Sequence, residues 1–124
     1  MIVVDKKKYK MEIVEAKQEV RVQVHGLIRE GDAASYLADL QETINKVSRR
    51  DYVFVVDATH QTPVPSKVVP QLEETMQFYS GLGFKEVFVV KPSSKIAQVQ
   101  IRNVLERIQF TGSLVDNVPH SNVH

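Results

Sequence analysis

Three side chains that can do chemistry lie close together in one stretch of the sequence: Asp57, His60 and Ser66. An acid, a base and a nucleophile of these types form the triad of many hydrolases, provided that the base lies within hydrogen-bonding reach of both partners. The Gly-x-Ser-x-Gly turn that presents a nucleophilic serine is missing here, because Ser66 is flanked by proline and lysine. We therefore expect no catalytic residue in this stretch, and we expect that the protein is not an enzyme.

Metal and cofactor sites are not indicated either. Asp57 and His60 supply two ligands, whereas a protein zinc site normally takes at least three from the chain. His120 and His124 are four residues apart, but their segment has no helical pattern that would bring them onto one face. The two glycines in residues 80–83 follow a predicted helix, whereas a phosphate-binding glycine loop precedes one. We expect no metal and no cofactor.

A strand and a helix flank this loop and position its side chains. Residues 53–56 form an unbroken apolar run, which is typical of a parallel strand buried on both faces. A helix is predicted after the loop, because apolar residues recur at spacings of three and four. These residues are Val69, Leu72, Met76 and Tyr79. A strand that leads through a loop to a helix N-terminus ends where ligands often bind in α/β sheets, so we expect any site within residues 51–79.

Ser66 has two interpretations, which depend on where this helix begins. Pro70 is tolerated only in the first turn, so the helix is expected to begin at residues 67–69, with Ser66 at its N-cap or just before it. A capping serine stabilises a helix by about 1 kcal/mol. A phosphorylated serine would instead add about −1.5 to −2 charges, which the helix N-terminus tolerates but a docked partner need not. Both interpretations stay open.

The N-terminal half predicts two strands and a helix. Alternating apolar residues predict strands around residues 11–13 and 20–24, joined in a hairpin through residues 15–18. The lysine-rich residues 5–10 are interpreted as a solvated approach to the first strand in preference to a basic patch. A helix capped by Asp32 and ending near Ser48 is expected next. Its apolar stripe consists of Leu37, Leu40, Ile44 and Val47.

The C-terminal half repeats the pattern of strand and helix. We expect a buried strand at residues 87–90, a helix capped by Ser93 or Ser94, and a short edge strand after residue 109. Two successive crossovers imply an α/β fold with a mixed sheet, parallel in its centre and with an N-terminal antiparallel strand. The helices are expected mainly on one face. We assign residues 1–112 to one domain and residues 113–124 to a flexible tail.

Composition narrows the classes of partner. The chain of 124 residues has 16 Lys and Arg against 15 Asp and Glu, too even a balance for binding driven by nucleic-acid phosphates. It has no cysteine, so disulfides are excluded, as expected of a cytoplasmic protein. No apolar run approaches the roughly 18 residues of a membrane helix. We expect a cytoplasmic protein without a nucleic-acid partner and without stable membrane insertion.

The order of elements over about residues 11–111, together with the surroundings of Ser66, resembles the STAS domain family of bacterial anti-sigma factor antagonists. In that family a central strand ends in a loop with Asp-x-Ser-Ser-Gly or Asp-Ser-Ser-Gly-Leu, whose serine is phosphorylated by a partner anti-sigma kinase. Ser66 matches this serine, whereas Pro65 replaces an acidic residue or serine and Lys67 replaces the glycine. The resemblance therefore implies a bacterial STAS-like domain with a degenerate phosphorylation motif.

From this loop and this resemblance we expect a non-enzymatic, regulatory protein–protein interaction module. Its contact surface is expected in the loop and helix start at residues 58–70. The contact residues are Asp57, His60, Val64, Pro65, Ser66, Lys67 and Val68, with Ser66 the phosphorylation candidate. The resemblance implies an anti-sigma factor or kinase, or another STAS protein, as partner, and a homo-oligomer stays open. The alternative is a small-molecule or lipid carrier, which needs a cavity between sheet and helices.

Overall fold

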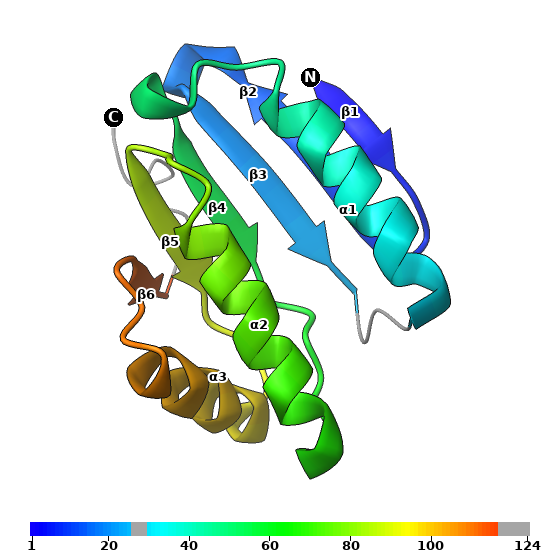
Figure 1. The fold of residues 1–124 in the computed structure, drawn as a ribbon, viewed down its shortest axis with the longest axis vertical. Helices are drawn as coiled ribbons and strands as arrows, with labels where there is room; N and C mark the ends of the chain where they lie inside the picture. Colours follow the sequence, from blue (N-terminus) through cyan, green and yellow to red (C-terminus); the bar gives the residue numbers. More distant parts are fainter. Residues whose placement is uncertain (26–29, 117–124) are drawn as a thin grey trace.

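The computed structural model describes residues 1–25 and 30–116 of the chain. Figure 1 shows a twisted sheet with helices laid across it. The strands are β1 (Ile2–Asp5), β2 (Tyr9–Val14), β3 (Glu19–Val24), β4 (Val53–Asp57), β5 (Glu86–Val90) and β6 (Ser113–Val115). The helices are α1 (Glu30–Ile44), α2 (Val69–Ser80) and α3 (Lys95–Arg107). Within the described residues, none of the helices combines the length and apolar character needed to cross a membrane.

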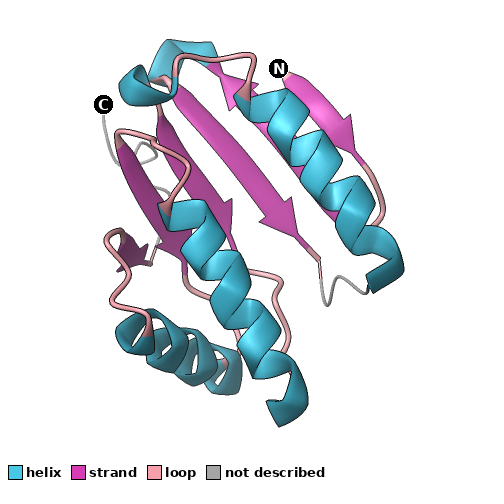
Figure 2. Ribbon diagram, in the orientation of Figure 1, coloured by secondary structure: helices cyan, strands magenta, loops and turns pink. Residues whose placement is uncertain are grey.

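The strands lie side by side in the order of the sequence, from β1 to β6. The pairs β1–β2 and β2–β3 are antiparallel, and the pairs from β3 to β6 are parallel. The predicted α/β fold, with a mixed sheet that is antiparallel at its N-terminal end, is confirmed. Each parallel crossover moves one strand further in the same direction, so right-handed connections place successive helices on the same face (Figure 2).

One large core fills the space between this face and the helices. It joins Tyr36 of α1, Tyr79 of α2 and Ile101 of α3 to alternate residues of the strands, such as Phe54 and Val89. A smaller cluster of Val53, Val55 and Val90 lies on the opposite face of the sheet. The predicted strand at residues 53–56 is therefore buried on both faces, as expected.

The N-terminal edge differs from the sequence prediction. Residues 2–5 form an additional strand, β1, which pairs with β2 through a register shift, so residues 6–8 form a turn between two strands. Tyr9 belongs to the core and is 2% exposed. The predicted hairpin at residues 15–18 is present, and Gln18 adopts the left-handed conformation that closes it (φ 50°). The short strand was missed because four residues carry too little periodicity.

Helix α1 buries part of the predicted apolar stripe, because Leu40 and Ile44 lie in the core, but Tyr36 is buried in place of Leu37. Tyr36, Leu40 and Ile44, spaced four residues apart, are buried, whereas Leu37 is 43% exposed. The helix begins at Glu30, so Asp32 lies inside its first turn and not at the N-cap. The assumption that aliphatic residues alone mark the buried face caused this error, because Tyr36 buries its ring and satisfies its hydroxyl inside the core.

The C-terminal elements follow the prediction closely. Ser94 caps α3, since its Oγ accepts a hydrogen bond of 3.3 Å from the N–H of Ala97. Gly81 ends α2 with ordinary φ, and the left-handed conformation falls on Gly83 (φ 85°). The short edge strand after residue 109 is β6, so the sheet extends beyond residue 112, where the sequence placed the start of the tail.

The observed face of α1 leads to a test with matched leucines. Leu40→Ala removes a side chain that is 0% exposed, so it is expected to lower the free energy of unfolding by about 2–5 kcal/mol. Leu37→Ala makes the same change one turn away at a largely exposed position and is expected to cost less than about 1 kcal/mol. Urea unfolding of both variants measures the difference. Equal losses would show that α1 packs in the register predicted from its aliphatic stripe.

Candidate functional site

The loop that follows β4 is held by its own side chains at its start. Asp57 lies at the end of β4, and its Oδ1 accepts hydrogen bonds from the backbone N–H and the hydroxyl of Thr59 (3.0 and 2.5 Å). His60 is exposed and stacks on His25 at the end of β3, with 5.3 Å between ring centroids. Asp57 and His60 are therefore each directed to a neighbour other than Ser66, and these contacts do not assemble a triad.

Further along this loop, the backbone of Val64 is held by the side chain of Gln100. Its backbone N–H donates to Oε1 of Gln100 (2.9 Å), and its carbonyl accepts from Nε2 of the same side chain (2.8 Å). The Val64 side chain, predicted from the sequence to contact a partner, is buried. One amide of α3 thus pairs with both polar groups of a loop residue, as a neighbouring strand would.

The residues after Val64 form the entrance to α2. Pro65, Ser66 and Lys67 are exposed, and Val68 is half-buried. Residues 66–68 form one turn of 3-10 helix before α2 starts at Val69. The N-cap positions of these two helices are Pro65 and Val68, and neither has a side-chain cap, so the capping interpretation of Ser66 is wrong. Pro70 lies in the first turn of α2, as predicted.

A cavity of about 400 Å³ lies between α1 and α2, over β3 and β4. Its volume is in the range of sites for small molecules. The lining is mainly apolar. Strands and loop contribute Val24, Val56, Ala58, Gln61, Val64 and Val68. The helices contribute Ala33, Tyr36, Leu37, Gln41, Gln71, Leu72, Glu74, Thr75, Met76, Phe78 and Tyr79.

The cavity includes part of the segment selected from the sequence and adds a wall that the sequence did not reveal. Val64 and Val68 face it, whereas Asp57, Ser66 and Lys67 are not among its lining residues. The opposite wall comes from α1, including Tyr36 and the exposed Leu37. Tyr36, an aromatic residue next to Leu37 in the predicted helix, was the available sequence signal for this wall. No local pattern, however, shows that α1 lies opposite α2.

The wall residues Tyr36 and Tyr79 meet inside the protein. Their hydroxyl groups share a hydrogen bond that links α1 to α2. The side chains are 4% and 2% exposed, respectively. Burial, and after it the neighbouring Tyr79, raises the pKa of Tyr36 well above its usual value. Burial raises the pKa of Tyr79 to about 12, although its hydrogen bond with Tyr36 acts in the opposite direction. Both hydroxyls are therefore protonated at physiological pH.

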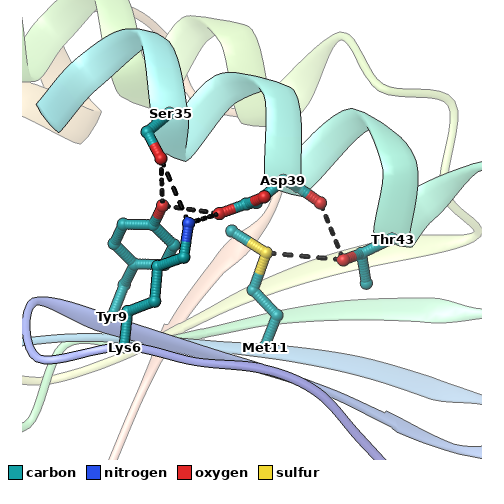
Figure 3. Close-up of polar contacts among 6 residues, drawn as sticks. All are labelled: Lys6, Tyr9, Met11, Ser35, Asp39 and Thr43. Carbon is teal, nitrogen blue, oxygen red and sulfur yellow. Dashed lines mark hydrogen bonds and ion pairs between the residues drawn. The ribbon is translucent and has the colours of Figure 1, made fainter.

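Polar contacts fix α1 on the β1–β2 hairpin (Figure 3), through residues that do not line the cavity. Oδ2 of Asp39 accepts hydrogen bonds from Nζ of Lys6 and from the hydroxyl of Tyr9, both at 2.7 Å. One turn further, the hydroxyl of Thr43 donates to the backbone oxygen of Asp39 (2.8 Å) and reaches Sδ of Met11 at 3.5 Å. These contacts determine where α1 lies relative to the sheet, and hence the position of one cavity wall.

No protein-family profile matches the chain, and no curated protein matches it significantly. The chemistry of the site therefore rests on its own residues. In residues 1–25 and 30–116, His, Asp and Glu side chains form no group of three or more that could hold a metal ion.

The two hydrogen bonds of Gln100 predict how the loop is stabilised. Gln100→Ala leaves the backbone N–H and carbonyl of Val64 without these partners, which is expected to lower the free energy of unfolding by about 1–2 kcal/mol. Amide hydrogen exchange of Val64 should accelerate as well. Gln77→Ala, at an exposed position of α2, is the control. Unchanged exchange at Val64 in the Gln100 variant would contradict the assigned role.

The carboxylate of Asp39 predicts a pH dependence of stability. The hydrogen bond from Lys6, and next the one from Tyr9, lowers the pKa of Asp39 in the folded protein. A lowered folded pKa stabilises the fold above the unfolded pKa of about 4, and this contribution is lost as the pH falls through the folded pKa. Asp39→Asn should therefore destabilise the protein at pH values near neutrality and have a smaller effect in acid.

Urea unfolding of wild type and Asp39→Asn measures this difference. It is carried out at neutral pH and at a pH below the pKa of Asp39 in the folded protein. Glu42→Gln removes an exposed carboxylate from the same helix and shows whether the effect belongs to residue 39. A destabilisation by Asp39→Asn that is equal at both pH values would contradict the assignment.

Proposed function

We propose that the protein is a non-catalytic binding protein for a small, largely apolar molecule held between α1 and α2. The observation that carries this proposal is the cavity of about 400 Å³, with its mainly apolar lining. Such a volume has room for about a dozen non-hydrogen atoms, if each takes roughly the 30 Å³ of a water molecule in the liquid. This was the alternative function expected from the sequence, and a cavity between sheet and helices is what it required.

The arrangement of the walls supports a bound ligand. Met76 is buried in the wall, whereas Leu37 and Gln71 are exposed at positions where the cavity meets solvent. An exposed leucine beside an apolar cavity gains burial when a ligand covers it. The Gln100 contacts hold the loop wall in place, so binding a ligand does not require that wall to be ordered first.

Filling the cavity from α1 is the direct test of this function. Ala33 is half-buried and lines the cavity, whereas its neighbour Ala34 is exposed and is not a lining residue. Ala33→Phe is expected to remove a co-purified ligand, because the ring occupies its space, and Ala34→Phe is expected to retain it. Native mass spectrometry of wild type and both variants, purified from the protein's own host, measures bound mass. A wild-type spectrum with the apo mass alone would contradict the proposal.

The second candidate is the regulatory protein–protein interaction module expected from the STAS resemblance. The exposed residues Pro65, Ser66 and Lys67 favour it, because they follow the restrained Val64 and so offer a surface that is ordered before a partner binds. Ser66 remains the phosphorylation candidate on this surface. The partner implied by the resemblance is an anti-sigma factor, a kinase or another STAS protein.

Paired substitutions test this second candidate. Ser66→Asp with Lys67→Glu reverses the charge of the exposed surface without changing the buried Val64. Ser93→Asp with Lys95→Glu makes the same changes at exposed positions near the start of α3. A partner captured from the host cytoplasm should be lost by the first pair and kept by the second. Retention by both pairs would remove residues 65–67 from the contact surface.

A further inference from the structure

We propose that the cavity selects neutral molecules that carry one hydrogen-bond acceptor, such as a carbonyl oxygen, over both pure hydrocarbons and carboxylates of similar size. This inference rests on the proposed small-molecule binding function and names the chemistry of its ligand. Two observations carry it: the hydroxyl groups of Tyr36 and Tyr79, and the charge of the side chains around the cavity.

One of the two hydroxyl hydrogens of Tyr36 and Tyr79 is not used in the hydrogen bond between them. Each tyrosine hydroxyl has one O–H donor, and the bond between Tyr36 and Tyr79 uses only one of the two hydrogens. Neither hydroxyl has another hydrogen bond within the part of the chain that the structure describes. Both side chains line the cavity and are nearly fully buried. A ligand oxygen that accepts the second hydrogen would therefore satisfy a donor that is otherwise removed from water.

The charge of the lining acts against anionic ligands. Among the described residues around the cavity, none is Lys, Arg or His, and Glu74 is the one acidic side chain. A carboxylate in a mainly apolar cavity would lose its hydration without gaining a cationic partner, which is costly. Glu74 would also repel it.

The protonation of the pair supports the same selectivity. Burial raises the pKa of both tyrosines, so the pair offers its hydrogen, and bears no charge, throughout the physiological range. A neutral ligand oxygen can accept this hydrogen without bringing a charge into the apolar cavity. A hydrocarbon fits the apolar wall as well, but it leaves the spare hydroxyl hydrogen without an acceptor.

Three probes of one shape test the selectivity: butyrophenone, which carries a ketone; butylbenzene, its hydrocarbon counterpart; and phenylbutyrate, which carries a carboxylate. Dissociation constants are measured by NMR titration of the full chain. Butyrophenone is expected to bind about three- to tenfold more tightly than butylbenzene, the factor that one net hydrogen bond supplies. Phenylbutyrate is expected to bind more weakly than either probe.

Removing both hydroxyls provides the control for the donor. Tyr36→Phe with Tyr79→Phe leaves the rings in place, so butylbenzene should still bind while the advantage of butyrophenone falls to about onefold. The single variants each leave one hydroxyl and should keep the preference. If the double variant fails to fold, the two single variants still test the proposal. Each must bind butyrophenone more tightly than butylbenzene, and loss of this preference in either would contradict the proposal.

The outcomes separate this inference from the function on which it rests. Equal binding of butyrophenone and butylbenzene by the wild type would overturn the selectivity and leave an apolar binding protein. Tighter binding of phenylbutyrate would overturn the inference about charge. Saturable binding of none of the three probes would overturn the proposed function itself.

Discussion

The contact between the buried side chains of Tyr36 and Tyr79 is the constraint on which the arrangement of the site depends. It joins α1 to α2 across the sheet, at the wall of the cavity that these helices enclose. On one side, α1 is anchored to β2 through Tyr9 and Asp39, and on the other, α2 is tied to α3 by the ion pair of Glu73 with Arg107. Helices α1 and α2 are thus anchored separately and meet through the hydroxyl groups of Tyr36 and Tyr79, and the cavity lies beside this contact.

The topology explains why such a space exists. Strands β3 to β6 follow one another in parallel, so each connecting helix is laid beside the previous one on the same face. Helix α1 connects β3 to β4, but it is fastened over the antiparallel hairpin by Lys6, Tyr9 and Asp39. This displaces it from α2, and β3 and β4 form the floor of the gap through Val24 and Val56.

The sequence predicts the elements well and the cavity poorly, for a physical reason. The apolar run of residues 53–56, the capping Ser94 and the proline in the first turn of α2 are local signals, and the structure contains each of them. The hydrogen bonds between Gln100 and Val64 join residues 36 positions apart, and the hydrogen bond between Tyr36 and Tyr79 joins residues 43 positions apart. Local periodicity does not reveal such contacts, so the sequence predicted Leu40 and Ile44 on the buried face of α1 but missed Tyr36 and the cavity wall. The same lack of a local signal hid the fact that Val64 points inward.

The cavity between α1 and α2 is proposed to bind a neutral, largely apolar molecule. A crystal structure of the wild-type protein soaked with butyrophenone tests it most directly. We expect electron density for the ketone in contact with Val68 and Met76, with its oxygen within hydrogen-bonding distance of a Tyr36 or Tyr79 hydroxyl. Density for the ketone only elsewhere on the surface, or a closed space with α1 packed directly on α2, would contradict it.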